Sequence, residues 1–202
     1  MGKQSGETWV VVLVKDFGTA KQRLQTALDA DKRRALALRN AELAVRAAAA
    51  GDRRLVVAGS EEAGALAARL GANFIVEPRQ EGQNPAARRG IEHAVASGAG
   101  AVLLLSSDLP LVTVRSVEEV LSAAKAKDGP LVMAVPAIGR GGTNALYLRP
   151  PGVIELQFGA DSLGKFRREA ESRSVGFATH YSAEMALDLD EPIDLTRLRR
   201  AV

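Results

Sequence analysis

The stretch Ala101-Val102-Leu103-Leu104-Leu105 decides the fold, because it is wholly apolar and is followed at once by the polar residues Ser106-Ser107-Asp108. A strand that is buried on both faces of a parallel sheet has such a continuous run, whereas a half-exposed strand alternates. Four more runs of this kind occur, at Trp9–Val14, Leu55–Ala58, Phe74–Val76 and Leu131–Val135. The sequence therefore predicts a largely parallel sheet.

The segments between these runs are rich in the good helix formers Ala, Leu, Arg and Glu. They are Asp29–Ala50, Glu61–Leu70, Pro85–Ser97 and Ser116–Ala126. Strands that alternate with helices predict an α/β fold, with a doubly wound, mostly parallel sheet and helices on both faces. Because no repeat or low-complexity linker interrupts the pattern, we expect a single domain over residues 1–202, with Met1–Thr8 as a frayed leader.

The pattern changes after Pro136. A flexible loop, Gly139-Arg140-Gly141-Gly142, precedes a predicted strand at Thr143–Leu148, and Pro150-Pro151 is expected to end that strand before a short helix. Two further helices are predicted at Asp161–Arg173 and Glu191–Arg200. These residues predict a C-terminal elaboration of the sheet.

Composition excludes several classes of function. The chain has 202 residues and no cysteine, so it has no disulfide framework, thiol nucleophile or cysteine-based zinc site, and a cytoplasmic location is the default. The apolar run at Trp9–Val14 is too short for a signal sequence or a membrane span. Lys and Arg exceed Asp and Glu by 27 − 24 = 3, and they are scattered without interleaved aromatic residues. This pattern does not predict nucleic-acid binding, but a small anionic substrate is compatible with it.

Ligands of open α/β sheets bind at the carboxyl ends of the strands. The loop after the first strand contains Gly18 and three cations, Lys15, Lys21 and Arg23, and backbone N–H groups and cations together can hold phosphate. A solvated loop is the alternative. A Walker A loop is excluded, since the Gly-Lys-Ser/Thr ending is missing.

Three carboxylates are candidate metal ligands. Asp108 follows a buried strand and could either bind Mg²⁺ or cap the turn at Leu109-Pro110. In an extended Leu187–Asp190 segment, Asp188 and Asp190 point to one face. Alone this pair is weak evidence, but with Asp108 it gives the oxygen-rich set that Mg²⁺ prefers.

A second anion site is predicted from two glycine-containing segments. Gly141 and Gly142 allow close approach of the backbone, and Thr143, Gly159 and Ser162 could supply hydroxyl and amide donors. Asp161 or Ser162 could instead be only the N-cap of the following helix.

Six segments in order carry a family resemblance: Val14–Leu24, Glu81–Asn84, Asp108–Leu111, Gly142–Leu146, Phe158–Ser162 and Leu187–Asp190. Together they resemble the 2-phospho-L-lactate and phosphoenolpyruvate guanylyltransferases of coenzyme F(420) biosynthesis, which are related to the wider MobA-like nucleotidyltransferases. The resemblance covers nearly the whole chain. It departs from the family pattern at Gln22, Gln83 and Pro85, where the family usually has Ser, Leu and Ala.

The resemblance implies that the phosphate of phosphoenolpyruvate or 2-phospho-L-lactate attacks the α-phosphorus of GTP and releases pyrophosphate. The implied site is as follows: metal ligands Asp108, Asp188 and Asp190 for Mg²⁺; acid contacts Thr143, Gly159 and Ser162; triphosphate contacts Lys15, Lys21 and Arg23; nucleoside contacts Gly82 and Asn84; and Lys15, Lys21 and Asp108 as the catalytic group. Because the attacking group is already an anion, no strong general base is needed.

Several alternatives remain at the level of sequence. A sugar phosphate or molybdopterin could be the acceptor, as in other MobA-like enzymes, or the chain could be a regulatory nucleotide-binding protein, since a fold does not fix a function. The composition, rich in Ala and Arg, is typical of bacteria, and bacterial members of the family are associated with phosphoenolpyruvate. Phosphoenolpyruvate is therefore the preferred acceptor, with 2-phospho-L-lactate or 3-phosphoglycerate as alternatives. A homodimer is common in such folds.

Overall fold

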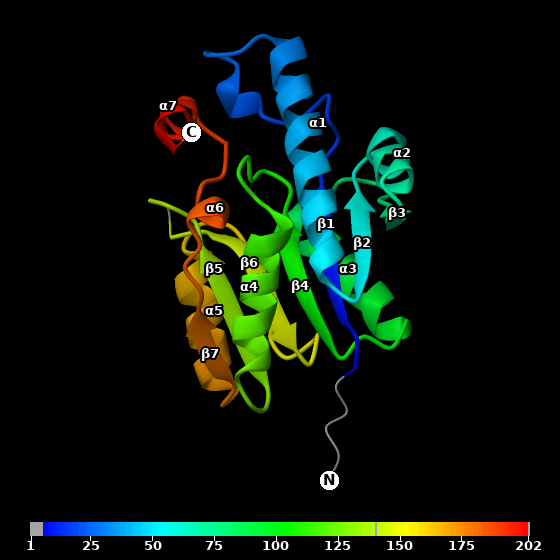
Figure 1. The fold of residues 1–202 in the computed structure, drawn as a ribbon, viewed down its shortest axis with the longest axis vertical. Coiled ribbons are helices and arrows are strands. Elements are labelled where there is room, and N and C mark those ends of the chain that lie inside the picture. The colour runs from blue at the N-terminus through cyan, green and yellow to red at the C-terminus, as the bar shows by residue number, and fades with distance from the viewer. Residues whose placement is uncertain (1–5, 140, 202) are drawn as a thin grey trace.

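The computed structural model describes residues 6–139 and 141–201, and the strands found there form one sheet (Figure 1). The strand order is β3-β2-β1-β4-β6-β5-β7, and every pairing is parallel except those of β6 with β4 and β5. The bounds are β1 Thr8–Val14, β2 Arg53–Ala58, β3 Asn73–Val76, β4 Ala101–Ser106, β5 Leu131–Pro136, β6 Thr143–Arg149 and β7 Gly176–Thr179. The predicted α/β class with a mostly parallel sheet is confirmed.

The helices follow the strands as the sequence predicts. They are α1 Ala30–Ala47, α2 Glu61–Arg69, α3 Gln83–Ala96, α4 Val114–Lys125, α5 Ser162–Ser172, α6 Ala183–Ala186 and α7 Pro192–Ala201, with 3₁₀ turns η1 Gln22–Leu24 and η2 Ala48–Ala50. Side chains of Asp29, Ser60 and Thr113 accept hydrogen bonds from the first-turn amides of α1, α2 and α4, which fixes where these helices begin.

Both faces of the sheet are buried, because alternate side chains of each central strand enter different cores. In β1, Val10 and Val12 pack with α1, α2 and α4, whereas Trp9 and Val11 pack with α3 and α5. Figure 1 shows α1 and α4 in front of the sheet. This double burial explains why the strands have continuous apolar runs instead of alternating ones.

Local structure differs from the expectations in three places. Thr8 is not part of a frayed leader, because it is the first residue of β1 and is buried. The segment after Pro150-Pro151 is a turn followed by bends rather than a short helix. β7 and α6 were not predicted; β7 lies at the sheet edge and is partly exposed, so it lacks a continuous apolar run. Residues 1–5 of the expected leader and Arg140 of the predicted loop lie outside the described residues.

The chain returns to the carboxyl ends of the strands after β7. The amide of Asn144 in β6 donates to the carbonyls of Met185 (2.9 Å) and Ala186 (3.1 Å), and the backbone N–H of Leu189 donates to the carbonyl of Asp108 (3.0 Å). Residues 185–194, hereafter the tail segment, therefore lie across the sheet edge where the loops after β1 and β4 begin.

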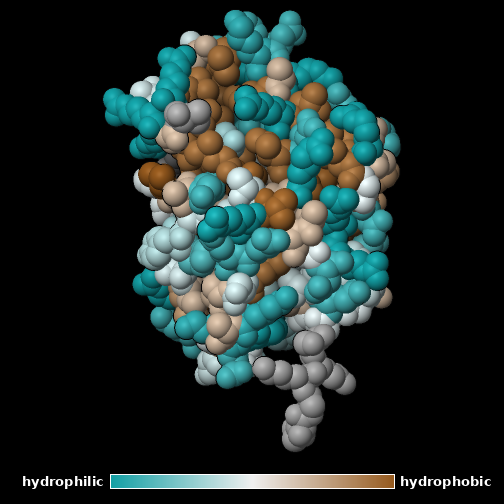
Figure 2. All heavy atoms as spheres, viewed as in Figure 1, coloured by the Kyte–Doolittle hydropathy of each residue, from teal (hydrophilic) through white to brown (hydrophobic). Residues whose placement is uncertain are grey.

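The surface is uneven in polarity. From the side shown in Figure 1, apolar residues gather in the upper half of the molecule, between α7 and α1, whereas the lower half is mostly hydrophilic (Figure 2). Among the described residues, no helix is long and apolar enough to cross a membrane.

Candidate active site

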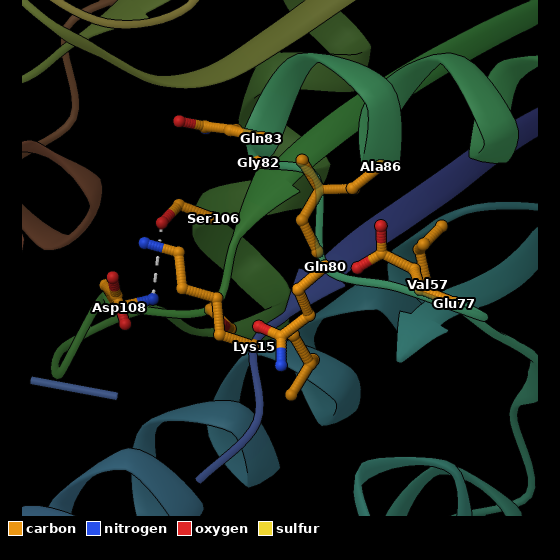
Figure 3. Close-up of a pocket in the computed structure, with 12 residues that line it drawn as sticks. Lys15, Val57, Glu77, Gln80, Gly82, Gln83, Ala86, Ser106 and Asp108 are labelled. Atoms are coloured by element: carbon orange, nitrogen blue, oxygen red, sulfur yellow. Dashed lines mark hydrogen bonds between the residues drawn. The ribbon is translucent and has the colours of Figure 1, made fainter. Parts of the chain in front are cut away.

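Two adjoining cavities lie at the carboxyl ends of β1 and β4. The first, the Glu77 cavity, has a volume of about 240 Å³ (Figure 3) and is lined by Leu13, Val14, Lys15, Val57, Glu77, Gln80, Gly82, Gln83, Ala86, Ser106, Ser107 and Asp108. The second, the Thr143 cavity, has a volume of about 430 Å³ and is lined by Lys15, Arg23, Gln83, Ser106, Asp108, Ala137, Gly142, Thr143, Asn144, Phe158, Gly159, Ala160, Ser162, Asp188 and Asp190. Lys15, Gln83, Ser106 and Asp108 line both cavities. The site therefore has two compartments that meet at these residues.

The three cations of the first loop have different positions. Lys15 is exposed and lines both cavities, and Arg23 lines the Thr143 cavity. Lys21 lines neither cavity, since its side chain is only 2% exposed and its Nζ lies 2.5 Å from Oδ1 of Asp108. The same Nζ donates to the carbonyl of Leu189 at 2.6 Å. Lys21 thus joins the first loop to Asp108 and to the tail segment, an arrangement different from the expected direct contact with triphosphate.

The three predicted metal ligands, Asp108, Asp188 and Asp190, all line the Thr143 cavity. Arg23 lies 2.7 Å from Oδ2 of Asp190 and is 67% exposed. Asp194, which is fully buried, accepts the backbone N–H groups of Asp190 (3.1 Å) and Glu191 (2.8 Å) and so fixes this end of the tail segment. Carboxylates that are distant in the sequence therefore line the same cavity.

The donors fit a hard divalent cation in their chemistry, because carboxylate oxygens are the ligands that Mg²⁺ and Mn²⁺ prefer. In the described part of the chain, however, no three acidic, histidine or cysteine side chains are close enough together to hold a metal ion. Asp108 is instead paired with Lys21, and Asp190 with Arg23. Lys21 engages Oδ1 of Asp108, and the exposed Arg23 pair costs little to break. A metal ion held by these residues would compete with Lys21 and Arg23 for their carboxylates.

The predicted acid contacts come together at the start of α5. The hydroxyl of Ser162 donates to Oγ1 of Thr143 at 3.0 Å, and both side chains are buried. Gly159 has a φ of 119°, which a glycine adopts without strain, and its carbonyl accepts the N–H of Ser162. Asp161 does occupy the N-cap position, but its side chain makes no capping hydrogen bond and pairs with Arg168 at 3.1 Å. Ser162, the first residue of α5, therefore places its hydroxyl and the positive end of the helix dipole beside the Thr143 cavity, which favours an anion, while the N–H groups of Ser162 and Leu163 are bonded to the carbonyls of Gly159 and Gly141.

The two residues predicted to contact the nucleoside, Gly82 and Asn84, lie in different surroundings. Gly82 lines the Glu77 cavity with a φ of 105°, directly before α3. Asn84 lines neither cavity: its Nδ2 donates to the carbonyl of Phe158 (3.3 Å) and its Oδ1 accepts the N–H of Phe158 (2.8 Å). Asn84 therefore connects α3 to the loop that carries Gly159 and Ser162, and its amide is engaged there instead of facing a nucleoside.

Sequence reasoning missed Glu77, Gln80 and Ser106, all of which line the Glu77 cavity. Glu77 directly follows β3, and Ser106 is the last residue of β4. Because ligands bind at the carboxyl ends of strands in such sheets, these positions could have indicated site residues. Partial burial raises the pKa of the Glu77 carboxyl above its ordinary value. Smaller effects come from Arg89, which lowers this pKa, and from Glu81, which raises it. Gln80 holds the loops together by donating to the carbonyl of Gly59 at 3.1 Å.

Solved structures with the same architecture define the class, because the fold is that of the nucleotide-diphospho-sugar transferases. A Desulfovibrio desulfuricans G20 protein described as a nucleotide-diphospho-sugar transferase has a TM-score of 0.74 at 19% identity, covering 96% of this chain and 87% of its own. A Mycobacterium tuberculosis H37Rv protein solved in complex with manganese has a TM-score of 0.57 at 19% identity, and the match covers 97% of this chain and 100% of that protein's chain.

Residues 8–199 match the family model described as "Guanylyl transferase CofC like", and the chain belongs to that family of nucleotidyltransferases. A phosphoenolpyruvate guanylyltransferase of Rubrobacter xylanophilus is 40% identical over 94% of this chain and 92% of its own length. A 3-phospho-D-glycerate guanylyltransferase of Phenylobacterium zucineum is 37% identical over 72% of this chain and 66% of its own length. A 2-phospho-L-lactate guanylyltransferase of Methanocaldococcus vulcanius is 28% identical over 92% and 81%.

Proposed function

We propose that the protein transfers GMP from GTP to the phosphate of phosphoenolpyruvate, releasing pyrophosphate and forming enolpyruvoyl-2-diphospho-5'-guanosine for coenzyme F(420) biosynthesis. The observation that carries this proposal is that the two cavities meet at Lys15, Gln83, Ser106 and Asp108. A reaction between two anionic substrates needs two compartments with a shared boundary where the reacting atoms meet.

The compartments differ in a way that supports GTP in the Glu77 cavity and the phosphorylated acid in the Thr143 cavity. The Glu77 cavity has an apolar floor of Leu13, Val57 and Ala86, which suits the faces of a nucleobase. The Thr143 cavity offers the buried hydroxyls of Thr143 and Ser162 and the first turn of α5, which suit a small phosphorylated acid. In this arrangement the α-phosphate of GTP lies at the boundary, beside Lys15.

The chemical step forms one P–O bond between the acid's phosphate and the α-phosphorus and breaks the bond to the β-phosphate oxygen, so that pyrophosphate leaves. Lys15 is exposed at the junction of the cavities and can neutralise charge on the reacting phosphates. Thr143 and Ser162 orient the acid, and the first turn of α5 reduces the repulsion between the two anions. No side chain has to remove a proton, because the attacking phosphate oxygen is already charged.

Mg²⁺ is the proposed metal, with Asp108, Asp188 and Asp190 as the residues that would hold it. When bound, such an ion supplies charge neutralisation and alignment of phosphate oxygens. Three carboxylates that line one cavity support this assignment, and the manganese complex of a protein with the same fold is consistent with it.

The acceptor is assigned as phosphoenolpyruvate because the 40% identical relative carries that name. The relatives named for 3-phospho-D-glycerate and 2-phospho-L-lactate define the alternative acceptors. With these small-molecule substrates and no cysteine, the proposal places the enzyme in the cytoplasm, without a nucleic-acid or membrane partner and as a homodimer.

The test is a competition assay. Purified protein is incubated with GTP, Mg²⁺ and an equimolar mixture of phosphoenolpyruvate, 2-phospho-L-lactate and 3-phospho-D-glycerate, and the products are identified by mass spectrometry while pyrophosphate is measured. We expect the phosphoenolpyruvate adduct to predominate and pyrophosphate release to require the metal. A predominant adduct with another acid would reassign the acceptor, and release of pyrophosphate without any adduct would refute the transfer reaction.

A further inference from the structure

The carboxylate of Glu77 is an unusual feature of the Glu77 cavity. Its Oε1 is buried and has no hydrogen-bond partner within residues 6–139 and 141–201. Figure 3 shows the carboxylate pointing inward, toward the side of the cavity where Gln80 and Ala86 lie. Its neighbours on the cavity floor, Leu13 and Val57, have no polar side-chain atoms to offer.

The nearby side chains Arg89 and Gln80 donate hydrogen bonds to other groups and not to Oε1 of Glu77. Arg89 on α3 influences Glu77 through space, but its Nη2 is bound to Oε2 of Glu81 at 2.9 Å. Gln80, the other polar side chain on this wall, directs its amide to Gly59. A buried carboxylate oxygen without a donor is costly, and such groups occur at sites where a ligand supplies the missing hydrogen bond. The missing partner is therefore a donor, located in the cavity.

We infer that Glu77 is the residue that selects guanine, by accepting hydrogen bonds from the base N1–H and exocyclic amine. This inference rests on the proposed use of GTP. A carboxylate has two acceptor oxygens and no donor, so it complements the adjacent N1–H and N2–H groups of guanine. Adenine presents an acceptor at N1, which the carboxylate would repel, and hypoxanthine keeps N1–H but lacks the amine. The apolar side chains of Leu13, Val57 and Ala86, which also line the cavity, suit contact with the faces of the base.

The test compares kcat/KM for GTP, ITP and ATP in the wild type and in Glu77→Ala and Glu77→Gln. A site built to hydrogen-bond a substrate group discriminates strongly against analogues that lack the group. We expect the wild type to prefer GTP to ITP by about 10-fold or more and to ATP by about 100-fold or more. In Glu77→Ala the GTP:ITP ratio should fall to about one, because the amine loses its acceptor. Glu77→Gln should lose most of the preference for GTP over ATP, since an amide can donate to adenine N1.

Glu81→Gln is the matched control. Glu81 is an exposed carboxylate close to Glu77 in the chain, but it does not line either cavity. This variant should keep both wild-type nucleotide ratios. Thermal unfolding checks the fold, and because Glu77→Gln removes a desolvated charge, it should unfold at or above the wild-type temperature at pH 7.

The outcomes separate this inference from the proposed function. If the wild type prefers GTP and Glu77→Ala retains the wild-type GTP:ITP and GTP:ATP ratios, the role of Glu77 is refuted while guanylyl transfer stands. If the wild type does not use GTP with any of the three acids, both ideas are refuted together. Collapse of the ratios in both Glu77 variants, with wild-type ratios in Glu81→Gln, supports the assignment.

Discussion

At Lys21, one ammonium group joins three parts of the chain. It belongs to the first loop, it lies 2.5 Å from the carboxylate of Asp108 after β4, and it donates to the carbonyl of Leu189 in the tail segment. The residue has a φ of 59°, so the backbone itself is turned to bring the side chain inward. Lys21 is thus a positioning residue for the carboxylates that line the Thr143 cavity.

Replacing Lys21 by Met should destabilise the protein by about 1–3 kcal/mol, less than the loss of a fully buried ion pair because Asp108 is 31% exposed. Urea unfolding measures the change. Arg23→Met is the matched control, because this cation also contacts the tail segment but is 67% exposed and should contribute only about 0–1 kcal/mol. Equal losses in the two variants would contradict the structural role of Lys21.

Asp188→Asn and Asp190→Asn test the proposed metal ligands. Each substitution removes a negative charge and keeps the side-chain shape, so the affinity for Mg²⁺ should fall while the fold remains. We expect turnover at limiting Mg²⁺ to drop at least about 10-fold, as for other metal-site substitutions, and to recover partly at high Mg²⁺. Turnover close to that of the wild type at limiting Mg²⁺ in both variants would exclude a metal role.

Sequence alone predicted which residue types reach the site, but not how they are oriented. Asp108 could be placed because it lies just after the carboxyl end of the buried strand β4. Thr143 could be placed because it is the first residue of the buried strand β6. Lys21 and Asn84 could not, since the partners that hold them, Leu189 and Phe158, are distant in the chain. These hydrogen bonds join residues that are 168 and 74 positions apart in the sequence. They form only when the backbone has folded, so no local sequence pattern predicts them.

At the scale of elements, α3 and the loop before α5 are linked by the paired hydrogen bonds between Asn84 and the backbone of Phe158. α3 begins at the Glu77 cavity, and the loop ends at Gly159 and Ser162 in the Thr143 cavity. The two compartments are therefore connected mechanically as well as in space.

Asn84→Ala should loosen the acid compartment more than the nucleotide compartment. We expect the KM for phosphoenolpyruvate to rise about 10-fold, because the loop loses two hydrogen bonds of about 1 kcal/mol each, and the KM for GTP to change little. Hydrogen exchange should accelerate at the Phe158 amide. Arg88→Ala, an exposed substitution on the same helix, is the control and should leave both KM values unchanged. A rise confined to the KM for GTP would show that Asn84 contacts the nucleoside after all.

Elements inside the sheet were predictable to within a few residues, because burial on both faces leaves an unambiguous run such as Ala101–Leu105 in β4. β7 was missed for the opposite reason. It is an edge strand beside β5, and its four residues, Gly-Phe-Ala-Thr, contain no continuous apolar run. The other edge strand, β3, is also exposed or partly exposed, but it was predictable because Phe74–Val76 is apolar.

For the whole molecule, the site is a junction between the first loop, two middle loops and the tail segment, so nucleotide binding should stabilise the entire fold. At a GTP concentration about 100 times its Kd, the linkage contributes about 2.7 kcal/mol, which corresponds to a rise in Tm of about 5–10 °C for a protein of this size. Differential scanning fluorimetry with GTP and Mg²⁺ measures the shift, with CTP as the control nucleotide. An equal shift with CTP would contradict a guanine-specific site.

The tail segment also determines when the enzyme becomes competent during its synthesis. Every strand of the described sheet precedes residues 185–194 in the chain, so the ribosome has already released the sheet-forming sequence before Leu189 can meet Lys21 and Asp108. A nascent chain interrupted just before the tail segment would hold all of these strands and yet lack one wall of its cavity. Completion of the Thr143 cavity therefore depends on a segment that is synthesised after every strand of the described sheet.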